Sequence, residues 1–176
     1  MELRKMNAGF GLAAAVLLLG HAVSLAVWML SRGSIPQVAD ALSWILTAAV
    51  LGHAIISIDL LISTYKGGKK QKGKHYPKLN IGTLVQRISG GLLILFTWLH
   101  IAGTLGITQT PPMVHAIVPP LFFSLVFVHV AISISKAFIT LGIGDAILVK
   151  RVDIIAKVIC VATLLADVIG FYLFVV

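Results

Sequence analysis

Five long apolar segments limit what this chain can fold into more than any other feature. They cover approximately residues 8–31, 38–64, 82–106, 113–137 and 153–176, and each is long enough to cross a hydrocarbon core as a helix. The sequence is 59% hydrophobic and 11% charged, whereas about a quarter of the residues in a soluble domain are charged. Backbone groups inside a bilayer must hydrogen bond within their own segment. We therefore predict an all-α integral membrane protein, residues 1–176 forming one domain of five transmembrane helices.

Basic residues are concentrated at one end of the predicted helices. The segment between the second and third helices, residues 66–78, is rich in lysine, and Lys150 and Arg151 lie between the fourth and fifth. Arg32 is the only basic residue in the connections at the opposite end. Because Lys and Arg favour the cytoplasmic side, we expect a cytoplasmic N-terminus in a cell inner (cytoplasmic) membrane. The net charge of +8 then reports topology and contacts with membrane lipid, and no nucleic-acid partner is expected.

A repeat places four histidines on the first four helices. Gly11 lies ten residues before His21, and Gly90 lies ten residues before His100. In the second and fourth helices, residues 53–58 (HAIISI) and 129–134 (HVAISI) share the pattern His-x-x-Ile-Ser-Ile. This pattern indicates a two-helix unit used twice, with the fifth helix added.

The four histidines fall into two groups by depth. At 1.5 Å per residue from the basic end, His21 and His100 lie about 20 and 24 Å deep, and His53 and His129 about 14 and 9 Å deep. Two stacked pairs of imidazoles inside a bundle favour two b haems, since facing helices can place one imidazole on each side of a haem iron. Hydrogen-bonded bundle histidines or a proton path are the alternative. His115 is either a rival ligand to His129 or part of a quinone pocket.

Small residues lie near the histidines. They leave room for a macrocycle, or else they allow close helix packing. The residues are Gly11, Gly20, Gly52, Gly90, Gly91 and Gly103.

Residues 86–100, QRISGGLLILFTWLH, carry a resemblance to a known family. An Arg-x-Ser/Thr-Gly pattern followed by a histidine resembles the cytochrome b membrane anchors of succinate dehydrogenases and quinol:fumarate reductases. Five helices in one chain, with histidines on the first four, are similar to the diheme, single-anchor type. The resemblance covers nearly the whole chain.

The resemblance implies specific roles for several residues. His21 and His100 would ligate the distal haem, and His53 and His129 the proximal haem. Arg87 would serve the haem propionates or the quinone, a role that Ser89 and Lys136 would share. For Arg87 and Lys136 the alternative is an interfacial cation whose charge reaches the membrane surface.

Three acidic residues are candidates for quinone or proton chemistry. Asp40 lies near the outer end of the second helix, where the family tends to place an acidic residue, and it is equally a candidate N-cap. Asp167 lies within hydrocarbon depth in the fifth helix, which makes it a candidate proton carrier. Asp59 would pair with Lys136 or border a proximal quinone site.

Together with the four histidines, the resemblance implies a diheme cytochrome b anchor of a succinate dehydrogenase or fumarate reductase. Such an anchor would transfer electrons between an iron–sulfur subunit and membrane quinone, either menaquinone or ubiquinone. The single cysteine, Cys160, excludes an iron–sulfur cluster held by this chain alone, and no Gly-x-Gly-x-x-Gly flavin motif is present. The chain therefore cannot oxidise succinate by itself, and a flavoprotein subunit is implied as well. The alternatives are a b-type anchor of a formate dehydrogenase, a hydrogenase or a heterodisulfide-type reductase, and a haem-free proton-coupled transporter.

Overall fold

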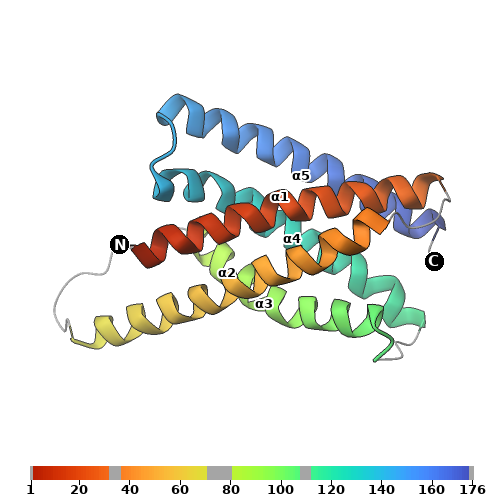
Figure 1. Ribbon diagram of the computed structural model, residues 1–176, viewed down its shortest axis with the longest axis horizontal. Coiled ribbons are helices and arrows are strands. Elements are labelled where there is room, and N and C mark those ends of the chain that lie inside the picture. The colour runs from red at the N-terminus through yellow and green to blue at the C-terminus, as the bar shows by residue number, and fades with distance from the viewer. Residues whose placement is uncertain (1, 32–36, 71–80, 108–111, 175–176) are drawn as a thin grey trace.

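The computed structural model describes residues 2–31, 37–70, 81–107 and 112–174, and the regular structure within them is α-helical. Five helices run up and down along one axis (Figure 1). They are α1 (Glu2–Ser31), α2 (Gln37–Lys70), α3 (Ile81–Thr104), α4 (Pro112–Leu141) and α5 (Ala146–Phe174). Each contains a stretch long and apolar enough to cross a membrane. The predicted multi-pass, all-helical membrane fold is therefore confirmed.

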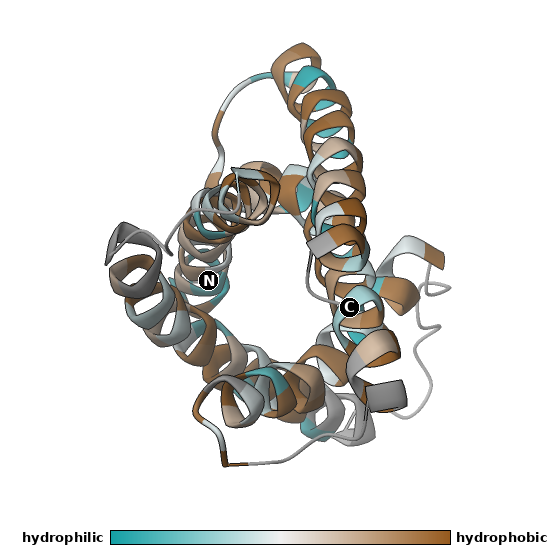
Figure 2. Cartoon of the chain, turned by 90° about the vertical axis from the view of Figure 1, so that its right-hand side faces the viewer, coloured by the Kyte–Doolittle hydropathy of each residue, from teal (hydrophilic) through white to brown (hydrophobic). Residues whose placement is uncertain are grey.

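Every helix contains many apolar residues (Figure 2), and many of the large ones are exposed. Trp44, Ile55 and Trp98 are each more than half exposed. In water so much exposed apolar surface would promote aggregation, but lipid tails are as apolar as a leucine side chain. The exposed surface is therefore suited to contact with lipid.

A buried hydrophobic cluster lies between α1, α4 and α5. Ala22, Phe127 and Cys160, one from each helix, form this cluster. On the outer side of this core, α2 packs against α1, and α3 packs against α4. Within the described residues, α2 and α3 make no extensive contact with each other. The chain thus folds as two hairpins, α1–α2 and α3–α4, joined through α1 and α4, with α5 packed against both of these helices.

Glycines with positive φ end two of the helices. Gly142 follows α4 with φ 72°, and the N–H of Ile143 donates to the carbonyl of Phe138 at 3.0 Å. This is the Schellman arrangement, which satisfies carbonyls that the helix end leaves without donors. Gly106, with φ 69°, follows α3 in the same way.

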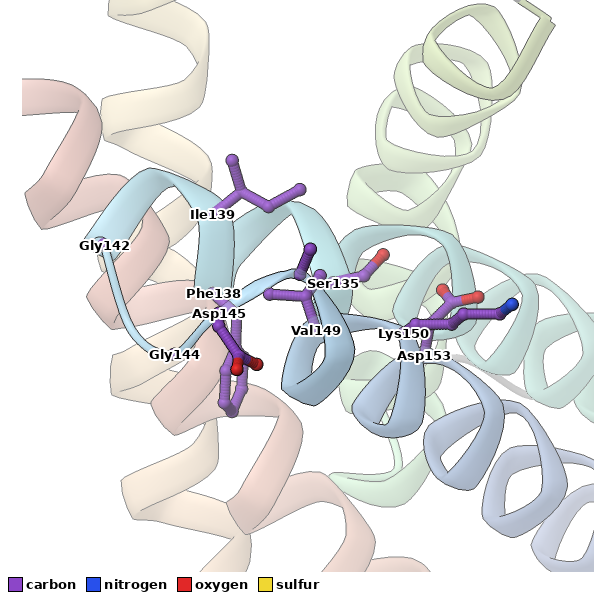
Figure 3. A pocket seen from close by; sticks show the side chains of 10 residues that line it. Ser135, Phe138, Ile139, Gly142, Gly144, Asp145, Val149, Lys150 and Asp153 are labelled. Carbon is purple, nitrogen blue, oxygen red and sulfur yellow. The ribbon is translucent and has the colours of Figure 1, made fainter.

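The turn between α4 and α5 is much shorter than the sequence suggests. Asp145 caps α5, since its Oδ1 accepts a hydrogen bond from the N–H of Leu148 at 2.8 Å. Gly144, with φ 80°, precedes it (Figure 3). The helix therefore begins at Ala146 and not near residue 153. Lys150 and Arg151 are exposed residues of its first turns, although their charges indicate a loop when the sequence is taken alone.

Candidate functional site: two histidine pairs between the hairpins

The four histidines on α1 to α4 are partly buried and are brought together in two pairs. His21 on α1 and His100 on α3 are close enough for their ring charges to interact. His53 on α2 and His129 on α4 interact electrostatically in the same way. Each pair takes one histidine from each hairpin, which is the grouping expected from depth. Their role as iron ligands stays a prediction.

The ring of His53 lies directly on Gly11 of α1. A Cβ at Gly11 would be 2.9 Å from the ring's Cε1, so only glycine leaves enough room for the ring in this position. The ring's Nδ1 lies 3.1 Å from the carbonyl oxygen of Asn7. A carbonyl can only accept, so in the neutral ring Nδ1 carries the proton and Nε2 keeps a lone pair for a metal or another donor. The Asn7 side chain also accepts a hydrogen bond from Ser57 at 3.0 Å.

His129 makes the equivalent contacts with α3. A Cβ at Gly90 would lie 3.1 Å from its Cε1. The ring lies near the carbonyl of Gln86, and its Nδ1 lies 3.0 Å from Ser89 Oγ. The Ser89 hydroxyl donates to the same carbonyl at 3.2 Å. As with His53, these contacts occupy Nδ1 and leave Nε2 as the ring nitrogen available for coordination.

The glycines near the histidines serve more than one purpose. Gly11 and Gly90 receive histidine rings from a neighbouring helix, and Gly52 receives the ring of Phe10, which would lie 3.0 Å from a Cβ at Gly52. At Gly91 and Gly103, an added Cβ would have no neighbouring atom within 4 Å. From the sequence, the glycines either leave room for a macrocycle or allow close helix packing. Gly11, Gly52 and Gly90 serve close packing, because each contacts a ring from a neighbouring helix.

Aromatic rings pack beside His100. His100 stacks on Phe122 of α4 with the ring centroids 5.1 Å apart and the planes at 28°. Phe122 lies next to Phe123, whose ring meets Phe171 of α5 nearly at right angles. The contact with Phe122 limits the orientation of the His100 ring on one side. The chain of ring contacts also connects α3, α4 and α5.

The charged candidates Asp59, Arg87 and Lys136 lie on three different helices and form no ion pair with one another among the described residues. Lys136 Nζ donates to Gln86 Oε1 at 2.7 Å. The expected ion pair between Asp59 and Lys136 is not found among the described residues, and both Asp59 and Arg87 are exposed. The reason is the helix arrangement: Asp59 is on α2, whereas Lys136 reaches the adjacent helix α3.

Asp167 of α5 is 3% exposed, and its Oδ1 has no hydrogen-bond partner within the described part of the chain. It lies on the helix that carries none of the four histidines. Two other candidates, Asp40 and His115, have side chains outside the described residues.

A cleft of about 540 Å³ opens at the turn between α4 and α5 (Figure 3). Its polar lining includes Ser135, Asp145, Lys150 and Asp153, and none of the four histidines borders it. In the described ranges no group of three or more His, Cys, Asp or Glu side chains is placed to hold a metal ion. Each histidine pair would offer two imidazoles, the set of protein ligands that a bis-histidine haem needs.

Asn7, Gln86 and Ser57 contact the histidine sites but are not predicted from the sequence. A signal for them exists in the repeat: Asn7 lies four residues before Gly11, and Gln86 lies four residues before Gly90. Since residues four apart share a helix face, a polar residue there is directed towards the same neighbour as the glycine.

Comparison with known proteins identifies no relative: no family model, no curated protein and no solved structure matches the chain.

Proposed function

We propose that this chain is a diheme cytochrome b that anchors a succinate dehydrogenase or fumarate reductase and passes electrons between an iron–sulfur subunit and membrane quinone. One observation carries the proposal. His53 and His129 come from different hairpins, lie within electrostatic range of each other, and each has its Nδ1 occupied by groups of the adjacent helix. A ligand histidine typically has this second-shell contact, because it fixes the tautomer and strengthens the coordinating nitrogen.

The two histidine pairs would match two haems, and the contacts of His53 and His129 support this for one of them. His53 and His129 would hold the proximal haem, and His21 and His100 the distal haem. Each haem, when bound, supplies a centre that accepts and releases one electron. The protein's part is to present Nε2 in a fixed orientation, through the Asn7 carbonyl for His53 and through Gln86 and Ser89 for His129. The apolar helices around the pairs exclude water, and they separate this electron path from the aqueous phase.

The proposed partners are a flavoprotein subunit and an iron–sulfur subunit on the cytoplasmic face. The bundle end that carries Arg4, Lys5, Lys150 and Arg151 is the proposed docking face, with those side chains exposed. Affinity capture of the tagged chain from its own membranes, followed by mass spectrometry, identifies the partner. Recovery of formate dehydrogenase, hydrogenase or heterodisulfide-type subunits would instead assign the chain to another quinone-linked oxidoreductase.

Single histidine replacements test the ligand assignment. Haem content and absorbance are measured on the purified wild-type chain and on the His100→Ala and His129→Ala variants. We expect His100→Ala to lose the distal haem and His129→Ala to lose the proximal haem, each keeping the other. Retention of both haems in either variant would show that the assignment is wrong.

Asp167 favours a second candidate function. A carboxyl group that is 3% exposed inside a membrane helix, with one oxygen unpartnered among the described residues, is typical of a proton-coupled transporter. In that case the histidines titrate and bind no haem. A purified chain that carries no haem and moves protons across vesicle membranes would support this function over the first.

A further inference from the structure

The two hairpins build their histidine contacts from equivalent residues, but the position seven residues after the histidine carries a lysine, Lys136, in only one of them. In α1–α2, the Asn7 side chain accepts a hydrogen bond from Ser57, four residues after His53. In α3–α4, the equivalent serine is Ser133, four residues after His129. Ser133 Oγ is buried and has no hydrogen-bond partner within the described residues.

In this hairpin the corresponding amide oxygen is bonded to a lysine. Lys136 Nζ donates to Gln86 Oε1 at 2.7 Å, and Gln86 is the counterpart of Asn7 in the repeat. Lys136 lies seven residues, two helical turns, after His129, and the position seven residues after His53 is Leu60. The positive charge is thus present in one copy of the repeat only.

The ammonium of Lys136 lies within electrostatic range of His129. Gln86 connects the two groups, since its side chain binds the ammonium and its carbonyl accepts from the Ser89 hydroxyl, which lies 3.0 Å from His129 Nδ1. Lys136 is half-buried, so solvent screens its charge less than that of an exposed lysine. A positive charge in this position therefore interacts electrostatically with any charged group that His129 binds.

We propose that Lys136, held in place by Gln86, raises the reduction potential of the haem bound between His53 and His129. The inference rests on the proposed function. Reduction of a haem iron adds one negative charge to the site, and a nearby positive charge stabilises the reduced form relative to the oxidised form. Lys136 is a positioning residue in this scheme: it acts on the haem through space and through Gln86, and it does not ligate iron.

Redox titration of the purified, haem-loaded chain tests the inference, with the two haems followed by absorbance. Lys136→Gln removes the charge, and we expect it to lower the midpoint potential of the haem that His129→Ala removes. Lys136→Arg keeps the charge and should restore the wild-type value. Lys157→Gln is the matched control, because it removes an exposed lysine whose ion pair is with Asp153 on its own helix.

An unchanged midpoint potential in Lys136→Gln with both haems retained would overturn the inference and leave the proposed function standing. An equal fall in Lys157→Gln would overturn it as well, since the effect would then be that of net charge alone. A wild-type chain without haem would overturn the proposed function itself. If Lys136→Gln does not accumulate, Gln86→Leu replaces it, because loss of the acceptor releases the ammonium and should also lower the potential.

Discussion

Gly90 and Gly91 are adjacent in the sequence and differ in what surrounds them. A methyl group at Gly90 would lie 3.1 Å from Cε1 of His129, whereas a methyl group at Gly91 would meet no atom within 4 Å. The ring cannot move aside freely, because Ser89 contacts its Nδ1 at 3.0 Å. We therefore expect Gly90→Ala to lower the free energy of unfolding by about 1–3 kcal/mol relative to Gly91→Ala.

Chemical unfolding of both variants in detergent measures this difference. Gly91→Ala provides the baseline, since alanine in an unobstructed helix position is as stabilising as glycine or more so. Equal unfolding free energies for the two variants would contradict the contact between Gly90 and His129. This prediction holds whether or not the chain binds haem.

Ser89 offers a second test at the scale of one residue. Its hydroxyl lies 3.0 Å from His129 Nδ1, so Ser89→Ala removes one of the two groups that orient the ring. Loss of such a second-shell contact weakens ligand binding by about 10- to 100-fold, and we expect faster haem release from the proximal site at the lower end of that range. Transfer of haem to apomyoglobin measures the rate.

The control for this variant is Ser124→Ala, which removes a hydroxyl that donates to the Pro120 carbonyl of its own helix. Haem release should be unchanged in this control. The same rate of haem transfer from Ser89→Ala and Ser124→Ala would show that the Ser89 hydroxyl does not help His129 to hold a haem.

Part of the histidine site could be predicted from the sequence. The separation of four histidines by helix and by depth follows from counting residues along apolar segments, and the structure brings the same pairs together. The contacts with Asn7 and Gln86 could not be found in this way, because they depend on the rotation of each hairpin about its own axis. The pairing of Asp59 with Lys136 failed for the same reason: sequence depth fixes height along the bundle and not the neighbouring helix.

At the scale of single helices, the start of α5 depends on one cap. Asp145 Oδ1 accepts the Leu148 N–H at 2.8 Å, and this bond satisfies a donor that the helix leaves free. Asp145→Ala should destabilise the fold by about 1 kcal/mol, whereas Asp145→Asn should stay close to wild type because asparagine is an equally good N-cap. Thermal unfolding in detergent compares the three proteins, and a loss in Asp145→Asn as large as in Asp145→Ala would contradict the capping role.

The number and type of helices could be predicted, but their ends could not. Hydropathy locates the part of each helix that lies in hydrocarbon, and a helix continues beyond that part wherever its backbone bonds are satisfied. For this reason α1 begins at Glu2 and α2 extends to Lys70, past the limits of their apolar segments. The break between α4 and α5 is set by Gly142, Gly144 and Asp145 and not by the basic pair that follows.

At the scale of the whole molecule, the arrangement of the helices matches the repeat in the sequence. The hairpins α1–α2 and α3–α4 meet through α1 and α4, so their histidines lie across the junction from each other. Among the described residues no large side chain is completely buried, and the buried positions are mainly small residues such as Ala22 and Ala102. A bundle of this kind gains little from its own core and is suited to stabilisation by lipid and by bound cofactors.

The orientation of the bundle gives another prediction. Because the basic residues gather at the end where α1 begins, that end should face the cytoplasm and the C-terminus should lie outside. Alkaline phosphatase, which is active only outside, should therefore be active when fused after residue 176 and inactive when inserted between residues 66 and 78. The reverse pattern of activity would contradict the orientation and the docking face proposed for the partner subunits.

The most direct test of the central claim is the absorbance spectrum of the purified wild-type chain, recorded oxidised and reduced together with haem per chain. Two histidine pairs predict a b-type α-band on reduction and two haems per chain. A chain that is folded and helical by circular dichroism, yet shows no α-band and no haem, would contradict the assignment of His21, His53, His100 and His129 as ligands.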